Sequence, residues 1–356
     1  MYQYFMMWRA LQLDMSLVKL LKCPSCGDSG MVCDVFKASD SGEVTDGILR
    51  CKSCGSSFII ENGLLELLTG NLVYSEERSI FHEKYGVQAP PQPSQLNSQT
   101  SFSQSDALQK QQQAYFDTYS HNDDLSYTSY EQQPFWLAAD KIAFTPWRRM
   151  IKPGSLVLDI GCAQGRSTFK LMDLDITVVG FDISKRLVRL ALDRYRQGHF
   201  KAKASFFAAD ALQLPFADCS FDYVLIYGVL HHLPEVGKVC GEIARVLKPG
   251  GIYLGQENNH SVFRGIFDFL QRIHPLWQDD GGPEAIISQK RIHEAFEHSN
   301  VLIKTKTSLF LPPHLINLLP KKAGYLLLKL TDALCRHLPF LKEQGGVIIM
   351  EVTKRP

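Results

Sequence analysis

The chain has 356 residues, with 38 lysines and arginines against 37 aspartates and glutamates and a formal net charge of +1. This length indicates two folded units, and the near-neutral charge disfavours a nucleic-acid partner, which usually demands a basic excess. No run of residues is long and uncharged enough to span a bilayer, and the N-terminus lacks the features of an export signal, so we expect a cytoplasmic protein. Met15 opens a more natural start than Met1, and whether residues 1–14 belong to the native protein stays open.

The first region, residues 16–70, contains two Cys-x-x-Cys pairs, Cys23 with Cys26 and Cys51 with Cys54. Each pair forms a tight turn, and two such turns supply the four sulfurs that tetrahedral zinc prefers. A chain without an export signal uses such pairs for metal rather than for disulfides. We therefore predict a structural zinc ion with no open coordination position. A redox dithiol pair and a ribbon that has lost its metal stay as alternatives.

Three short runs surround these cysteines, at residues 21–26, 49–55 and 60–65. On these runs, the segment from Leu21 to Leu68 resembles the small zinc-ribbon proteins that act as activating partners of methyltransferases. The resemblance implies a zinc-ribbon domain over residues 16–70, and it leaves open a role of that domain in docking another protein.

Residues 75–135 are polar and rich in Gln, Ser, Asn and Tyr, a composition that buries too little apolar surface to fold alone. We interpret residues 88–108 as a flexible linker. The rest, up to about Met150, is expected to be helical in pieces, with aromatic anchors that include Tyr115 and Phe116.

From Ile151 onward, apolar strand-like runs alternate with helix-like runs. Strands are expected at residues 156–160, 177–182, 205–209, 223–226 and 252–256, with a final strand at 345–352 and helices at, for example, 185–197 and 235–247. This alternation is typical of βαβ units, so we predict an α/β fold with a doubly wound, mostly parallel sheet.

A glycine turn follows the first of these strands, at residues 158–165. Ala163 and Arg166 break the G-x-G-x-x-G pattern that lets a pyrophosphate sit against a helix N-terminus. Asp159, two residues before the first glycine, would also repel a pyrophosphate. The loop suits a ligand with an ammonium or sulfonium group, as in S-adenosylmethionine.

Acidic residues follow the next two strands: Asp182 ends one, and Asp210 comes directly after the other. This order of strand, glycine turn, helix and acidic residue is typical of a nucleotide-binding half of a doubly wound sheet. With S-adenosylmethionine as ligand, Asp182 would accept hydrogen bonds from both ribose hydroxyls, and Asp210 with Ala211 would contact the adenine edge.

Six motifs follow one another in register, at residues 157–165, 180–184, 209–216, 221–224, 230–233 and 245–251. On these motifs, residues 155–256 resemble class I S-adenosylmethionine-dependent methyltransferases of the type-11 group, which includes ubiquinone and menaquinone C-methyltransferases. The resemblance implies a Rossmann-like, seven-stranded sheet over residues 141–356, with an antiparallel last strand and helices within 71–140 that close over the cofactor. It implies cofactor contacts from Asp159, Gly161, Ala163, Gly165, Asp182, Ile183, Asp210, Ala211 and Tyr227. The family more often has glycine at position 163.

Methyl transfer from a sulfonium needs a base only when the acceptor carries a proton of high pKa. His231 and His232 follow the fourth strand, at the sheet edge where active sites lie, and either is a candidate base. The alternative is that the pair caps a helix and packs near the cofactor. The run from Gln256 to His260 leaves the fifth strand at the same edge and is expected either to face the acceptor or to form a capped turn.

Residues 261–344 lie where such enzymes place a substrate cover, and they are aromatic and apolar with a few basic residues. They would admit a lipid-like acceptor or lie on a membrane surface; a helical cap buried against the sheet is the alternative. We predict methyl transfer to oxygen or carbon of a small, lipophilic or glycan-linked acceptor. An RNA methyltransferase with a zinc module and a non-catalytic partner-binding protein are the competing hypotheses.

Overall fold

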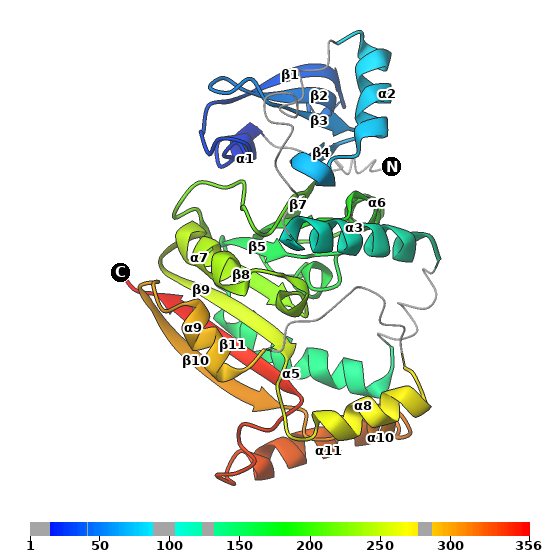
Figure 1. Ribbon diagram of the computed structural model, residues 1–356, viewed down its shortest axis with the longest axis vertical. Coiled ribbons are helices and arrows are strands. Elements are labelled where there is room, and N and C mark those ends of the chain that lie inside the picture. Colours follow the sequence, from blue (N-terminus) through cyan, green and yellow to red (C-terminus); the bar gives the residue numbers. More distant parts are fainter. Residues whose placement is uncertain (1–14, 41, 88–103, 123–131, 277–286) are drawn as a thin grey trace, which may run out of the picture.

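The structure, a computed structural model, describes residues 15–40, 42–87, 104–122, 132–276 and 287–356. In these residues eleven strands form one mixed sheet in the order β1-β2-β3-β4-β7-β6-β5-β8-β9-β11-β10 (Figure 1). The strands are β1 Met31–Ala38, β2 Val44–Cys51, β3 Ser57–Glu61, β4 Leu64–Glu66, β5 Leu156–Ile160, β6 Thr177–Asp182, β7 Lys203–Ala208, β8 Phe221–Tyr227, β9 Leu247–Asn258, β10 Val301–Ser308 and β11 Val347–Lys354.

The helices of the described residues connect and cover these strands. They are α1 Met15–Val18, α2 Ser75–Tyr85, α3 Gln104–Asn122, α5 Pro134–Met150, α6 Lys185–Gln197, α7 Val236–Val246, α8 Arg264–Ile273, α9 Gln289–Ala295, α10 Pro313–Ile316 and α11 Lys321–Cys335, with short 3-10 turns η1 Gly70–Leu72, η3 Thr168–Lys170 and η4 Leu230–His232. Residues 104–108 begin α3, so the linker interpretation is wrong for them; residues 88–103 lie outside the described residues.

Seven neighbouring strands, in the order β7-β6-β5-β8-β9-β11-β10, make the predicted doubly wound sheet. Strands β5 to β9 pair in parallel, and β11 lies antiparallel between β9 and β10. The central strands β5 and β6 are almost wholly buried because helices cover both faces of the sheet, which explains their continuous apolar runs. On one face α5 and α6 share a core, and on the other α7 and α9 share a second core with residues of the ribbon. The predicted fold class is confirmed.

The cysteine-containing region is joined directly to this sheet. Strand β4 pairs in parallel with β7, through Leu65 opposite Phe207 and Glu66 opposite Ala208. The Leu67 amide also donates to the Ala208 carbonyl at 2.7 Å. The sheet therefore continues from β7 into β4, β3, β2 and β1, and β7 is not an exposed edge.

The expected substrate cover at residues 261–344 divides into two parts. Residues 289–308 contain α9 and β10, which pack on and extend the sheet. Helices α8, α10 and α11 lie together at the lower end of the molecule in Figure 1. Only this second part is placed as a cover, with α11 packed on α5 through Leu328.

Candidate active site and metal centre

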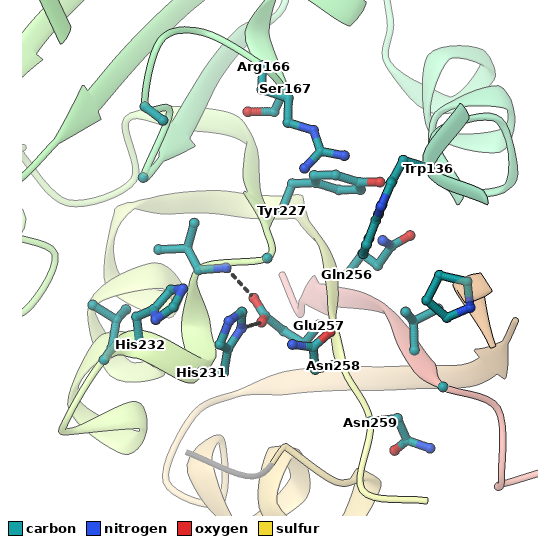
Figure 2. Close-up of a pocket in the computed structure, with 18 of the residues that line it drawn as sticks. Trp136, Arg166, Ser167, Tyr227, His231, His232, Gln256, Glu257, Asn258 and Asn259 are labelled. Carbon is teal, nitrogen blue, oxygen red and sulfur yellow. Dashed lines mark hydrogen bonds and ion pairs between the residues drawn. The ribbon is translucent and has the colours of Figure 1, made fainter. Parts of the chain in front are cut away.

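A cavity of about 1420 Å³ opens at the carboxyl ends of the parallel strands, the edge where open α/β sheets bind ligands. Its walls come from the glycine turn after β5, the ends of β6, β8 and β9, helices α3 and α5, and the cover helix α8. Figure 2 shows the part of the wall formed by β8, β9 and their following loops. The lining includes seven of the nine predicted cofactor-binding residues; Asp159 and Gly165 are not among them.

The glycine turn closely follows the floor of this cavity. Gly161 has a φ of +69°, and a Cβ there would lie 2.5 Å from a methyl carbon of Val229. Gly165 has a φ of +86°, and a Cβ there would lie 2.3 Å from the Phe169 ring. Both positions therefore require glycine. Ala163 adopts the same left-handed region, with a φ of +47°, at a cost of about 1 kcal/mol.

Asp159 lies behind the turn and is fully buried. Its carboxylate accepts hydrogen bonds from the hydroxyls of Ser167, at 2.7 and 2.9 Å, and Thr168. Burial raises the pKa of Asp159 to about 6, and Asp182 contributes to the same shift. The structure thus places Asp159 as a brace for the turn rather than in contact with the cavity.

Asp182 and Asp210 both line the cavity. Asp182 accepts the backbone N–H groups of Ala163 at 3.0 Å and Ser184 at 2.9 Å, and burial raises its pKa to about 6. Asp210 accepts the Leu212 N–H at 2.8 Å and the side-chain amide of Gln109 at 2.6 Å, and burial raises its pKa as well. Two acceptor groups therefore face one cavity, a set that suits ligand hydroxyl and amino groups.

Tyr227, at the end of β8, belongs to a polar cluster that the sequence did not predict. Its hydroxyl donates to Asp140 at 2.7 Å, and Asp140 also pairs with Lys170 at 2.6 Å. The Arg166 guanidinium lies 5.2 Å from the Tyr227 ring and 5.8 Å from the Trp136 ring (Figure 2). Burial and Asp140 together raise the pKa of Tyr227 well above its usual value. The sequence feature that could have indicated this cluster is Asp140, the one acidic residue of helix α5, which lies on its buried face.

His231 and His232 both line the cavity, but their surroundings differ. Nδ1 of His231 lies 2.7 Å from Oε2 of Glu257, whose side chain is fully buried. The other oxygen of Glu257 accepts the Val229 and Leu230 N–H groups at 3.0 and 2.7 Å. Since a carboxylate only accepts, Nδ1 carries the proton and the ring lone pair is on Nε2.

His232 lies beside His231, with ring centroids 4.0 Å apart, and its ring meets Phe116 edge-on at 5.5 Å. Burial, with a contribution from His231, lowers the pKa of His232 to about 3. His232 is therefore neutral at neutral pH and a weak base. Strand β9 is longer than predicted, and its last residues, Gln256, Glu257 and Asn258, line the cavity. Asn259, directly after the strand, also lines it, and its amide donates to the Glu343 and Gly345 carbonyls.

Helix α3 covers the cavity with amide side chains, which is why its sequence is so polar. Gln109 donates to Asp210, Gln112 to the His232 carbonyl, and Gln113 to the carbonyls of Leu72 and Ile183. These three glutamines are buried. They lie in the stretch that was expected to be helical in pieces, directly after the predicted linker, and only the tertiary structure reveals their partners.

The four cysteines of the two Cys-x-x-Cys pairs come together at one end of β1 and β2. Their sulfurs all lie within 4.8 Å of one another, with 3.6 Å from Cys23 to Cys54 and from Cys26 to Cys51. A zinc ion bound at about 2.3 Å by four thiolates separates its sulfurs by about 3.8 Å. The cluster therefore fits a small zinc-binding module, and all four positions of a tetrahedral ion would be filled by protein.

Residues 158–255 match the family model of a methyltransferase domain. The chain is 38% identical over 102 residues to the 27-O-demethylrifamycin SV methyltransferase of Amycolatopsis mediterranei, covering 28% of this chain and 38% of that protein. It is 35% identical over 139 residues to the demethylmenaquinone methyltransferase of Renibacterium salmoninarum, covering 36% and 56%. Among solved structures, the PH0226 protein of Pyrococcus horikoshii aligns with a TM-score of 0.43 and 18% identity, covering 62% of this chain and 92% of that one.

The chain thus spans less than two thirds of the length of both methyltransferases. The family resemblance predicted from the sequence is nevertheless confirmed for the segment that contains the six motifs. Residues 158–255 form a methyltransferase domain of the class I, S-adenosylmethionine-dependent type. No helix of the described residues combines the length and apolarity that crossing a membrane requires.

Proposed function

We propose that this chain transfers a methyl group from S-adenosylmethionine to an oxygen or carbon atom of a small, lipophilic acceptor. The observation that carries the proposal is the position of the His231–Glu257 pair in the same cavity as the glycine turn, Asp182 and Asp210. One wall suits the cofactor and the other offers a base.

The residues around the glycine turn fit the cofactor. Gly161 and Gly165 leave no room for a side chain, and Asp182 and Asp210 present acceptors to hydroxyl and amino groups. Oε1 of Gln256 is buried at the cavity wall without a hydrogen-bond partner in the described residues. When bound, S-adenosylmethionine supplies a methyl group on a positively charged sulfur. Asp182 would hold the ribose, Asp210 and Ala211 the adenine, and Tyr227 would line the wall beside the reacting centre.

His231 is the base in this proposal. Glu257 holds its Nδ1 proton and thereby presents Nε2 as the acceptor for the proton of a hydroxyl. Glu257 also stabilises the imidazolium that forms, and this stabilisation is large because the carboxylate is shielded from water. His232, with its depressed pKa, would pack against Phe116 and shape the wall.

The outer half of the cavity supports an apolar acceptor. Aromatic and aliphatic side chains of the cover line it, among them Phe263, Phe267, Leu311 and Pro313. Two methyltransferases to which the chain is similar act, by name, on a demethylrifamycin and a demethylmenaquinone. Both names agree with an acceptor larger and more apolar than an amino acid.

The test is to incubate the purified protein and radiolabelled methyl donor with a cell extract and to separate lipid, small-molecule, RNA and protein fractions. We expect label in the lipid or small-molecule fraction, and none with Asp182→Ala. Label confined to RNA or protein would overturn the proposed acceptor class. Failure of the protein to bind the donor in calorimetry would overturn the proposed activity.

We further propose that the four cysteines hold a structural zinc ion that orders residues 16–70. The support is their convergence on one point and the match of their sulfur separations to a tetrahedral thiolate site. One zinc ion per chain in elemental analysis is the expected result.

A further inference from the structure

Helix α8 is amphipathic but contributes no buried residue to the fold. Four apolar residues follow one another at spacings of four, three and four: Val262 in the turn before α8, and Ile266, Phe269 and Ile273 within it. This spacing places them on one side of the helix. Their exposed fractions are 73%, 59%, 62% and 66%. Exposure of such an apolar face to water costs free energy, so the face is a candidate contact surface.

Helices α10 and α11, which lie beside α8 in Figure 1, carry further exposed apolar residues. The ring of His314 in α10 lies 6.0 Å from that of Phe267, and its Nε2 donates to the His274 carbonyl at 2.9 Å, so α8 and α10 are in contact. In α11, Leu328 packs on α5, whereas the exposed residues Leu326, Leu330 and Leu334 repeat every four residues. We call the exposed apolar residues of α8, of the turn before it, and of α10 and α11 the docking face; they are Val262, Phe263, Ile266, Phe269, Ile273, Leu315, Leu326, Leu330 and Leu334.

Positive charge surrounds the docking face. Residues 261–276 and 309–344 contain seven lysines and arginines against three aspartates and glutamates, although the whole chain is close to neutral. Two ion pairs neutralise part of this charge, Arg264 with Asp268 at 2.7 Å and Arg336 with Asp332 at 3.7 Å. Five basic residues against one acid, Glu343, lie outside these two pairs. Lys321 and Lys322 at the start of α11 are exposed. This charge is complementary to an anionic lipid surface.

The docking face also connects to the cavity. Phe263 and Ile266 are exposed, and both line the cavity that holds the His231–Glu257 pair. Their neighbours Phe267 and Leu276 line the cavity too. An apolar path therefore leads from the surface between the cover elements to the proposed base.

We propose that the docking face binds the surface of an anionic lipid membrane, with α8 lying in the interface plane, and that the acceptor is an amphiphile drawn from that membrane past Phe263 and Ile266. Apolar side chains on one face with basic residues around them are the features of a helix that lies in a lipid interface. The part concerning the acceptor rests on the proposed function; the docking itself does not.

The test is sedimentation of the full, zinc-loaded chain with lipid vesicles. One set of vesicles is phosphatidylcholine alone, and the other also contains about 30% phosphatidylglycerol, which supplies about one anionic lipid in three. The chain should bind the anionic vesicles and bind the neutral ones more weakly. The double variant Phe269→Ser/Ile273→Ser, whose residues do not line the cavity, should bind at least about tenfold more weakly. Lys321→Ser/Lys322→Ser should weaken binding by about fivefold for each charge.

The matched control is Ile80→Ser/Leu302→Ser, two exposed apolar residues in α2 and β10, away from the docking face. It should bind vesicles like the unchanged chain. No binding of the unchanged chain to anionic vesicles would overturn the proposal, and so would equal loss in the control. A dimer in solution that Phe269→Ser/Ile273→Ser converts to monomer would also overturn it, because a second copy would then cover the face.

Two further readouts separate this proposal from the proposed function. Donor binding in calorimetry should be the same in all variants, since none of them touches the glycine turn. Vesicle binding without donor binding would refute the proposed activity and support docking. Label in the small-molecule fraction with none in the lipid fraction would refute the membrane origin of the acceptor.

Discussion

Glu257→Gln isolates the proposed base without changing the shape of the site. The amide oxygen can still accept the Val229 and Leu230 N–H groups, but the amide nitrogen then faces Nδ1 of His231. Because an amide nitrogen only donates, the ring must place its proton on Nε2 and its lone pair on Nδ1. His231 would then present a donor, not an acceptor, to the cavity.

The expected loss follows from the role of a positioned base, which contributes about 10²- to 10⁴-fold to a rate. We therefore expect kcat to fall by roughly that factor, about 3–5 kcal/mol of barrier. The fold should persist: two N–H contacts change from a charged to a neutral acceptor, at a cost of about 1–3 kcal/mol, within the stability of a typical domain.

The assay is initial-rate methyl transfer to the acceptor identified by fractionation, together with nitrogen NMR of the His231 ring. Glu257→Gln should lower kcat with little change in KM, and the ring signal should show the exchanged tautomer. His231→Ala should be as slow, and the double variant no slower, because the two residues act as one unit. His232→Asn is the matched control and should keep most of the activity. A Glu257→Gln enzyme within threefold of the unchanged rate would refute this reasoning.

Three further predictions concern the cofactor wall and the metal. Asp182→Ala should abolish donor binding in calorimetry while circular dichroism shows an unchanged fold; unaltered affinity would contradict the assignment. Burial raises the pKa of Asp182 to about 6, and the carboxylate is the form that accepts hydrogen bonds from the ribose hydroxyls. Donor affinity should therefore be full above about pH 6 and fall by up to about tenfold per pH unit below it. A flat affinity profile from about pH 5 to 8 counts against this role. Removal of zinc by a chelator should raise hydrogen exchange in β1, β2 and β3 while β5 and β6 stay protected, and a protein without zinc would exclude the metal centre.

The parts of the fold that are local in sequence could be predicted. Strands β5 and β6 and helix α6 have their predicted bounds, because a buried parallel strand is a continuous apolar run and Ser184 caps the helix that follows. The glycine turn at 161–165 could also be predicted, because it too depends on local sequence. Its backbone conformation excludes a side chain whatever the rest of the chain does.

The parts that depend on distant contacts could not be predicted. The roles of the glutamines of α3 could not be predicted because their partners, Asp210 and the carbonyls of Ile183 and His232, lie in other elements. Glu257 is one of several polar residues at the end of β9, and only its burial against His231 distinguishes it. The pairing of β4 with β7 involves two short apolar runs that look like core strands of separate domains.

The ribbon strand β4 is linked by a buried ion-pair cluster to helix α6, which follows the strand that ends at Asp182. Glu66 of β4 is buried between Arg78, at 2.9 Å, and Lys185, at 3.2 Å. Breaking such a buried pair leaves an uncompensated charge and is strongly destabilising. Lys185 begins α6 directly after Ser184, whose hydroxyl donates to Asp117 of α3 at 2.6 Å and whose N–H donates to Asp182.

Tyr74, between the ribbon and α3, completes this connection. Its hydroxyl donates to Asp117 at 2.8 Å and accepts the Lys185 N–H at 3.1 Å. The register of β4 on β7 therefore fixes Lys185, and Lys185 and Tyr74 fix the end of α3 that covers Asp182. On this reasoning the ribbon supports the proposed cofactor wall by direct contact, as part of one sheet.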